Sequence, residues 1–436
     1  MNPFYSNPPD IKKPVHIDLF VNRDEELFFL KEWLLAEKTN ESIGAVIGQP
    51  RIGKSHLCYK ALADLEKDNH SEYILINANH IEHLSNLLFE LYRFITEKIK
   101  NIPADLYEKN ETQKAFYDCL CEDISHYNEL LTVAVDTITC EVLVEKGEAL
   151  KSKLQTNIEG TLETGIKLFI KSTLNLKTLV GYEREKSTGK SETKTHTVVY
   201  RKPDNQGMVD IINDFIRGYS ILIGEKRLFL YIDDLDRITR DIKENDHLIS
   251  ELIYCLKKLS LRNPNLLIFA SISESFYNAS KEKFFRLIRL LRPMKTENLM
   301  EIYKRRCDFY AIQFIPHEAT TQLAAVFKGS PGRFLDALDK FYMDRGRLPM
   351  KEFKDILAYL RNEIDELENG TRSSITGLKQ ILENKVKKSI YDISQDDFGA
   401  NLDLFRTPLV GEILYEAPLS PGKYQINPMY YEALKQ

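Results

Sequence analysis

The sequence predicts an α/β protein whose core is a buried parallel sheet. Three short apolar runs, Ile43–Ile47, Leu228–Ile232 and Leu266–Ala270, have the length and continuity of strands that are buried on both faces. Stretches with helical apolar spacing separate these runs. Alternation of such strands and helices is typical of a three-layer fold, in which helices cover both faces of the sheet.

Composition places the chain among globular proteins with more than one domain. It has 436 residues, of which 43% are hydrophobic and 29% are charged, as expected for two or three globular units. The net charge of −5 excludes a general attraction to nucleic acid, so any such site must be local. The six cysteines include no CxxC pair, and no apolar run has membrane-spanning length or forms a signal-peptide core. We therefore expect a cytoplasmic protein that does not associate with membranes.

The N-terminal region combines an extended arm with a helix. Residues 1–19 contain four prolines and are expected to be extended. A helix should then begin within Phe20–Leu27 and run to about Glu37, with Asn22 as its cap and acidic side chains in its first turn.

The segment from Gly48 to Ser55, GQPRIGKS, matches the phosphate-binding loop pattern G-x(4)-G-K-[ST]. It lies between the first predicted strand and a helix, an arrangement that directs backbone N–H groups and a helix N-terminus at an anion. Lys54 would bind the β- and γ-phosphates of ATP, and the Ser55 hydroxyl would ligate Mg²⁺. The residues expected to surround the phosphates are Gly48, Gln49, Pro50, Arg51, Ile52, Gly53, Lys54, Ser55 and His56.

Two carboxylates follow the second predicted strand. Asp233 and Asp234 stand at its C-terminal end, where open α/β sheets bind their ligands. Beside a Mg²⁺–nucleotide, Asp233 would hold the metal through water, and Asp234 would orient or activate the attacking water. Polar residues also end the third strand, where they could contact the γ-phosphate or that water. Of these, Ser273 could equally cap the helix that follows.

A long insertion separates the loop from the carboxylates. Strand Glu72–Asn77 and helices over about 83–100 and 111–131 precede it, and apolar spacing becomes irregular over residues 132–205. From Gly160 to Lys202 there are nine lysines and arginines against four glutamates. Two interpretations remain open: the basic stretch binds DNA or RNA phosphates, or it is a solvated loop.

Helices and a hairpin follow the sheet. Helical spacing predicts helices over residues 296–310, 318–327 and 332–342. A further domain begins near Met350 and ends in a hairpin with strands over 412–417 and 423–426, the outline of a winged helix. Residues 371–436 carry eight basic and eight acidic side chains, a balance that makes protein at least as good a partner as DNA for this domain.

Together these motifs resemble the AAA+ and STAND superclass of P-loop ATPases, nearest its origin-recognition-like, replication-initiator branch. The resemblance implies an AAA+-type P-loop three-layer parallel sheet with a helical lid and a C-terminal winged-helix domain. The corresponding units are an N-terminal arm (1–19), an ATPase core (20–294, including the insertion 132–205), a lid (295–347) and a winged-helix-like domain (348–436).

Two further segments carry the resemblance. Asn2-Pro3-Phe4 followed by Phe20–Glu26 resembles the opening box of bacterial members, which packs against adenine. This implies base and ribose contacts from Phe20, Val21 and Arg23. Gly329–Arg333 resembles the lid-helix motif whose arginine touches the γ-phosphate, which implies a catalytic role for Arg333 beside Lys54 and Asp234.

The chain also departs from the family pattern. Asp234 stands where glutamate is common, and its shorter side chain implies slow hydrolysis. Gly332 separates Pro331 from Arg333, which changes the register of that arginine. Initiator-type members contact DNA through insertions between the phosphate loop and the acidic strand, where residues 132–205 lie in this chain. Arginine fingers act from a neighbouring subunit; the candidates, which structural ion pairs would explain as well, are Arg286, Arg289 and Arg292.

These features favour an ATP-binding and ATP-hydrolysing switch that couples nucleotide state to assembly on a partner. The partner could be DNA, contacted through residues 160–202, another protein, or further copies of this chain. The alternative is a STAND-like signalling or defence ATPase, whose insertion and C-terminal domain recognise proteins and whose turnover is slow or negligible. A third hypothesis is an adaptor that binds nucleotide only structurally.

Overall fold

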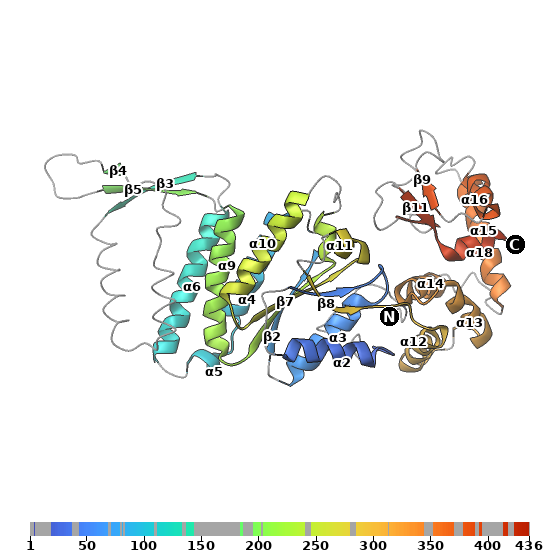
Figure 1. Ribbon diagram of the computed structural model, residues 1–436, viewed down its shortest axis with the longest axis horizontal. Helices are drawn as coiled ribbons and strands as arrows, with labels where there is room; N and C mark the ends of the chain where they lie inside the picture. The colour runs from blue at the N-terminus through green and yellow to red at the C-terminus, as the bar shows by residue number, and fades with distance from the viewer. Residues whose placement is uncertain are drawn as a thin grey trace.

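The structure is a computed structural model in which several layers of helix and strand follow one another along the long axis (Figure 1). The residues that it describes are 4, 19–36, 43–68, 71–78, 81, 83–108, 111–132, 137–143, 184–185, 195–201, 204–239, 246–279, 285–312, 314–343, 352–369, 378–388, 392–394, 413–416 and 423–435.

A five-stranded parallel sheet forms the centre of the larger unit. Its strands are β1 (Ile43–Ile47), β2 (Ser71–Asn77), β6 (Arg227–Asp233), β7 (Leu266–Ile272) and β8 (Phe285–Leu290). They are arranged in the order β2-β6-β7-β1-β8, and every neighbouring pair is parallel. Because β7 lies between β1 and β6 and all three strands are parallel, their carboxyl ends lie side by side at the same end of the sheet.

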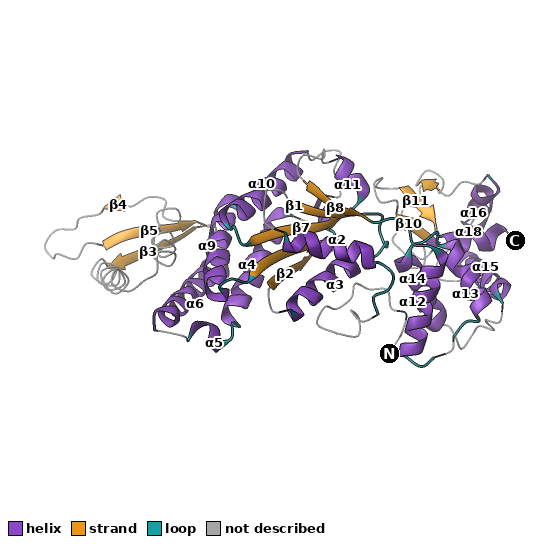
Figure 2. Ribbon diagram, turned by 60° about the horizontal axis from the view of Figure 1, so that its bottom comes forward, coloured by secondary structure: helices purple, strands orange, loops and turns teal. Residues whose placement is uncertain are grey.

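Helices cover both faces of this sheet (Figures 1 and 2). Helices α2 (Asp24–Leu35) and α3 (Lys54–Lys67) bury their apolar side chains against one face. Helices α4 (Leu84–Lys100), α9 (Asn205–Ile223) and α10 (Asp246–Arg262) bury theirs against the other. The predicted three-layer α/β fold is therefore confirmed.

Two elements of this core were not predicted. Strand β8 forms an edge of the sheet and pairs only with β1 in the part of the chain that the structure describes. Its alternation of arginines with apolar residues suits an edge strand, which needs less apolar surface than a central one. Helix α10 was also missed, although Ile249, Leu252, Leu256 and Leu259 show helical spacing and are buried.

The insertion begins beyond α5 (Ala104–Tyr107) and α6 (Glu111–Thr132). Its described strands are β3 (Thr137–Leu143), β4 (Arg184–Glu185) and β5 (Thr195–Arg201), which form an antiparallel sheet in the order β3-β5-β4. Figure 1 shows this sheet at the end of the molecule opposite the C-terminus. Most of the basic stretch 160–202 lies outside the described residues, so its proposed contact with nucleic acid stays a prediction.

The lid and the C-terminal unit share one hydrophobic cluster. The lid helices are α12 (Thr296–Phe309), α13 (His317–Val326) and α14 (Pro331–Met343). The C-terminal unit contains α15 (Phe353–Asn369), α16 (Leu378–Lys387), α18 (Pro428–Lys435) and the antiparallel sheet of β9 (Asp392–Ser394), β10 (Leu414–Glu416) and β11 (Lys423–Ile426). The predicted hairpin is confirmed as β10 and β11. Assignment of this unit as a winged helix remains a prediction, as do the domain boundaries.

The N-terminal segment is anchored in the same cluster. Phe4 is fully buried, and its ring stacks on Tyr303 with centroids 5.7 Å apart. The expectation that Asn22 caps α2 is wrong. Arg23 holds the cap position without a side-chain bond, and Asn22 Nδ2 donates to Glu301 Oε2 on the lid at 2.5 Å instead. The beginning of the chain therefore joins the lid to the core.

None of the described helices has the length and apolar character needed to span a membrane.

Candidate functional site: a phosphate loop, a carboxylate strand and a lid

The phosphate loop connects β1 to α3, as predicted. Helix α3 begins at Lys54, directly after Gly53, whose φ of 98° lies in the left-handed region that favours glycine. Gly48 is required for another reason. A Cβ at this position would lie 2.9 Å from the Ile52 side chain and 3.2 Å from the Leu291 carbonyl oxygen. The local geometry of the loop therefore explains why both positions are glycine.

Lys54 folds back over the loop. Its side chain is buried, and Nζ donates hydrogen bonds to the carbonyl oxygens of Gly48 at 3.1 Å and Gln49 at 3.2 Å. Both acceptors are backbone carbonyl oxygens, and within the described residues no acidic side chain forms an ion pair with the ammonium. The charge thus lies inside the loop, beside the N-terminus of α3, where both the ammonium and the helix dipole favour an anion.

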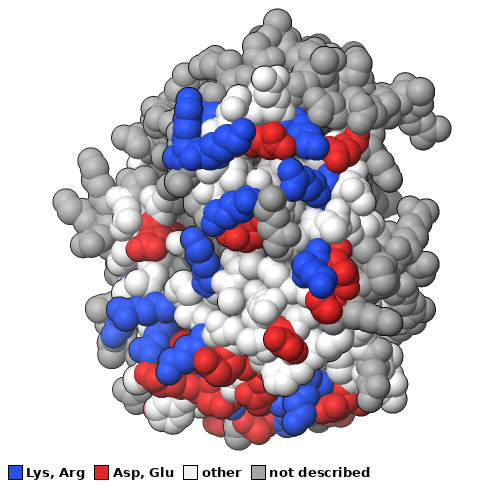
Figure 3. Space-filling model, turned by 90° about the vertical axis from the view of Figure 1, so that its right-hand side faces the viewer, with Lys and Arg blue, Asp and Glu red and all other residues white. Residues whose placement is uncertain are grey.

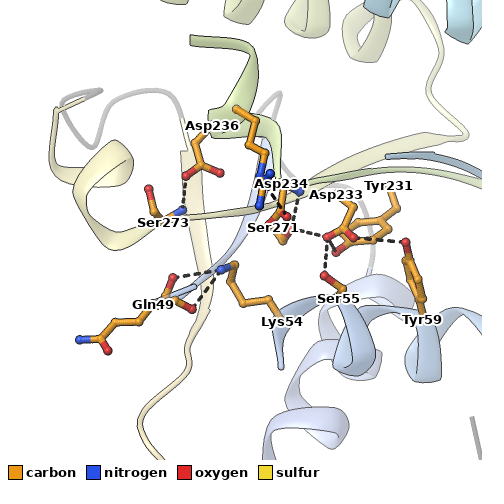
Figure 4. Close-up of polar contacts among 12 residues, drawn as sticks. Gln49, Lys54, Ser55, Tyr59, Tyr231, Asp233, Asp234, Asp236, Ser271 and Ser273 are labelled. Atoms are coloured by element: carbon orange, nitrogen blue, oxygen red, sulfur yellow. Dashed lines mark hydrogen bonds and ion pairs between the residues drawn. The ribbon is translucent and has the colours of Figure 1, made fainter. Parts of the chain in front are cut away.

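Asp233 is the polar centre of the site (Figure 4). It is fully buried at the end of β6. Its Oδ1 accepts hydrogen bonds from the hydroxyls of Ser55 at 2.8 Å, Tyr231 at 2.7 Å and Ser271 at 2.6 Å, and its Oδ2 accepts one from Tyr59 at 3.2 Å. Burial, reinforced by the Asp233 charge, raises the pKa of both tyrosines far above the ordinary value. The two phenols therefore stay protonated and donate to the carboxylate.

Asp234 lies next to this group and is partly accessible, with 24% of its side chain exposed. Its backbone is left-handed, with φ of 52°, and its N–H donates to Ser271 Oγ at 2.7 Å. Burial, followed by the Asp233 charge, raises the pKa of Asp234 to about 6. A carboxylate with a pKa near neutrality is suited to accept a proton from water.

Ser273 and Asp236, at the same end of the sheet, form hydrogen bonds with backbone N–H groups. Ser273 Oγ accepts from the Phe276 N–H at 3.3 Å at the start of α11 (Glu274–Ala279), so this serine caps that helix, one of the two predicted roles. The Ser273 N–H donates to Asp236 Oδ2 at 3.2 Å. Asp236 belongs to the 3₁₀ helix η3 (Leu235–Thr239) and was not singled out in the sequence.

The segment before α2 reaches the loop from the other side. The Phe20 ring meets the His56 ring edge to face, with centroids 5.4 Å apart. Arg23 is buried, and its Nη2 donates to the carbonyl oxygens of Ile52 at 3.0 Å and Arg292 at 3.1 Å. Of the predicted base and ribose contacts, Arg23 thus supports the loop backbone, whereas Phe20 forms an aromatic pair with His56, a residue expected near the phosphates.

Helix α14 of the lid touches the loop directly. The Gly332 N–H donates to the Arg51 carbonyl oxygen at 2.9 Å, and Ser330 Oγ donates to the same oxygen at 3.3 Å. A Cβ on Gly332 would lie only 2.8 Å from that oxygen. The glycine that interrupts the expected pattern therefore lies directly against the loop backbone, where an added side chain would not fit.

A cavity of about 510 Å³ lies where loop, lid and C-terminal sheet meet. Gln49 and Pro50 line it from the loop, and Arg333 lines it from α14. Asp392 and Gln425 contribute from the C-terminal sheet, where Gln425 Nε2 donates to Asp392 Oδ1 at 3.1 Å. The structure thus brings Arg333 to the phosphate loop and adds two residues that the sequence did not indicate.

The three candidate finger arginines occupy different surroundings. Arg289 pairs with Glu25 at 2.5 Å and lies over the Phe29 ring, 4.6 Å from its centroid. This supports the structural ion pair for that residue. Arg286 and Arg292 are exposed, and a finger role for either stays a prediction.

Oxygen donors at the loop suit Mg²⁺. The Ser55 hydroxyl and the Asp233 carboxylate, 2.8 Å apart, are ligand types that this hard cation prefers. Within the described residues, this site included, no group of three or more histidine, cysteine or acidic side chains could hold a metal.

The strand order, the loop after β1, the acidic end of β6 and the lid on the loop define the AAA+-type P-loop fold. Two similar solved structures are proteins from Aeropyrum pernix. The ORC2 protein, in ADPNP–ADP complexes, is 11% identical with a TM-score of 0.43, covering 100% of this chain and 96% of that one. The ORC1 protein, in complex with DNA, is 11% identical with a TM-score of 0.41, covering 95% of this chain and 92% of that one. No family model and no curated protein matches the chain. Similarity this low assigns no residue a role, so the fold class depends on the geometry above.

Proposed function

We propose that this protein is an ATP-binding and ATP-hydrolysing molecular switch that couples its nucleotide state to assembly on a partner. One observation carries the proposal: the phosphate loop, the lid helix with Arg333 and the C-terminal sheet line a single cavity. A nucleotide whose phosphates lie on this loop would contact groups from separate parts of the chain. Its presence or hydrolysis would then change how those parts fit together.

The chain's own residues would divide the chemistry as follows. Lys54 exchanges its bonds to the loop carbonyls for bonds to the β- and γ-phosphates. Ser55 and Asp233 hold Mg²⁺, which when bound neutralises charge on the phosphate oxygens. Asp234 accepts the proton of the attacking water, and Arg333 approaches the γ-phosphate from the lid. The short Asp234 side chain favours slow turnover.

The base would be bound on the side of the loop formed by the N-terminal box. Phe20 and His56 present ring surfaces there, and aromatic rings stack well on a purine. Val21 is buried in the lid cluster and Arg23 holds the Ile52 carbonyl, so in this proposal both position the box rather than stack on the base.

Two kinds of partner are compatible with the surface. Figure 3 shows basic and acidic side chains interspersed on the face of the lid and C-terminal end, where acidic groups gather along one border. Such a mixed surface favours a protein partner or another copy of the chain over DNA. DNA binding would therefore depend on the basic stretch 160–202.

A second candidate function is a STAND-like signalling ATPase with slow turnover. The observation that favours it is the position of Asp392 and Gln425 beside the loop, because a C-terminal unit that reads the nucleotide directly suits a protein held in an off or on state. Turnover separates the two functions. A switch that cycles hydrolyses ATP repeatedly and faster with its partner, whereas a signalling ATPase retains one nucleotide per chain.

Lys54→Ala and Asp234→Asn test the site. We expect Lys54→Ala to abolish ATP binding, because it removes the cation inside the loop, and Asp234→Asn to retain binding while blocking turnover. Lys60→Ala is a matched control on α3, because Lys60 pairs with Asp64 at 2.9 Å instead of entering the loop. Equal ATP affinity in wild type and Lys54→Ala would refute the site. Turnover measured with and without duplex DNA at low salt tests the DNA partner; no binding and no stimulation would exclude it.

A further inference from the structure

Hydroxyl groups surround the Asp233 carboxylate and stabilise its charge. It is fully buried, and within the described residues no lysine or arginine forms an ion pair with it. Four hydroxyl groups donate to it instead, at distances of 2.6 to 3.2 Å. Hydrogen bonds to an ionised carboxylate are stronger than neutral ones, so these hydroxyls hold the charge and fix its orientation.

The four donors are not equivalent. Ser55 is also the candidate ligand of Mg²⁺, so its bond to Asp233 is the one that would be exchanged when metal and nucleotide bind. Ser271 accepts from the Asp234 N–H at 2.7 Å, which directs its own hydrogen toward Asp233. The remaining donors, Tyr59 and Tyr231, have no candidate role in binding nucleotide.

Packing fixes both tyrosine rings. Tyr231 precedes Asp233 by two residues on β6, so their side chains share one face of the strand. Its ring stacks on Phe269 with centroids 4.8 Å apart and meets the Tyr59 ring edge to face at 5.8 Å. Tyr59 lies one helical turn after Ser55 on α3, so both hydroxyls point toward the carboxylate. Neither phenol can rotate away without disturbing the core.

We propose that Tyr59 and Tyr231 are positioning residues for Mg²⁺: they hold Asp233 in the orientation that the metal requires, with and without nucleotide. The inference rests on the proposed binding of Mg²⁺–ATP. In this inference, one hydroxyl group from α3 and one from β6 surround the carboxylate that would bind the metal. Such outer partners of a metal-binding carboxylate commonly affect metal affinity by about 10- to 100-fold.

The test removes one oxygen atom at a time from the full-length chain. In Tyr59→Phe and Tyr231→Phe, the Mg²⁺ concentration that gives half of the maximal gain in affinity for a fluorescent ATP analogue is compared with wild type. We expect this concentration to rise by about 10- to 100-fold, while affinity for the analogue in EDTA stays within about twofold of wild type because the loop is intact. Thermal unfolding without nucleotide shows whether each variant is folded. If Tyr231→Phe does not fold, Tyr59→Phe is the variant to test, because its hydrogen bond to Asp233 is longer than that of Tyr231.

Tyr219→Phe is the matched control. Tyr219 is a buried tyrosine that donates to a carboxylate, Glu72 Oε2, at 3.3 Å, but that pair lies outside the nucleotide site. We expect it to leave the Mg²⁺ requirement unchanged. An unchanged Mg²⁺ requirement in Tyr59→Phe and Tyr231→Phe, or an equal loss of affinity in EDTA, would overturn the positioning role alone. A wild-type chain that binds the analogue under neither condition would refute the proposed function itself.

Discussion

Replacing Gly332 with alanine should separate the lid from the phosphate loop. The added Cβ would lie 2.8 Å from the Arg51 carbonyl oxygen and 2.9 Å from Arg51 Cβ. Neither atom can rotate away, so α14 must move outward by about half an ångström or more to restore van der Waals contact. Overpacking of this kind costs about 1–3 kcal/mol, and loss of the bond from Gly332 N–H to Arg51 adds about 1 kcal/mol.

The cost falls on contact between the lid and the loop, so it should appear in nucleotide affinity. The two costs together, about 2–4 kcal/mol, correspond to a dissociation constant about 30- to 700-fold higher. Titration with a fluorescent ATP analogue measures this change, and limited proteolysis reports whether the lid is more accessible. Gly224→Ala is the control: its φ of 69° makes alanine strained, but no atom lies within 4 Å, so stability should fall without loss of affinity. A Gly332→Ala protein with wild-type affinity and wild-type proteolysis would refute a role for the lid in nucleotide binding.

Two further predictions concern proton transfer and the N-terminal anchor. Because the pKa of Asp234 is raised to about 6 and a base must be ionised, turnover should be level above that pH and fall about tenfold per pH unit below it; a steady-state pH profile without this limb would exclude Asp234 as the base. Phe4→Ala should cost about 3–5 kcal/mol of unfolding free energy, because the ring is fully buried among lid aromatics. Urea denaturation measures this loss, with Phe28→Ala, whose side chain is 59% exposed, as the control that should change little.

The sheet and the loop could be predicted because their signals are local. Ile43–Ile47 and Leu228–Ile232 are central strands buried on both faces, so their apolar runs are continuous. The loop depends on glycines and a lysine at fixed spacing, which a pattern detects directly. Strand β8 lacks such a run, because Arg286 and Arg289 interrupt it, and its role as an edge became visible only with the pairing to β1.

Interactions between distant parts of the chain could not be predicted in this way. Tyr59 and Asp233 are in contact only because α3 packs on the sheet beside the end of β6 in the folded chain. Given the two motifs, however, a simple signal existed: Tyr59 is one turn after Ser55, and Tyr231 is two residues before Asp233. Gly332 shows the opposite case, in which a visible departure from a pattern had a cause that only the distance to Arg51 revealed.

The arrangement also indicates which end of the molecule senses the nucleotide first. The lid and the C-terminal unit bury their side chains in one hydrophobic cluster, so a movement of α14 on the loop must carry the C-terminal sheet with it or break that cluster. The insertion is placed differently, because it extends from α6 and α9 on the far face of the sheet (Figure 2). Among the described residues, the elements that lie between the phosphate loop and the insertion belong to the packed core that contains β6 and α9, and a packed core resists small displacements. We therefore expect the C-terminal unit to respond directly to the nucleotide, and any partner bound by the insertion to be tethered to the switch rather than controlled by it.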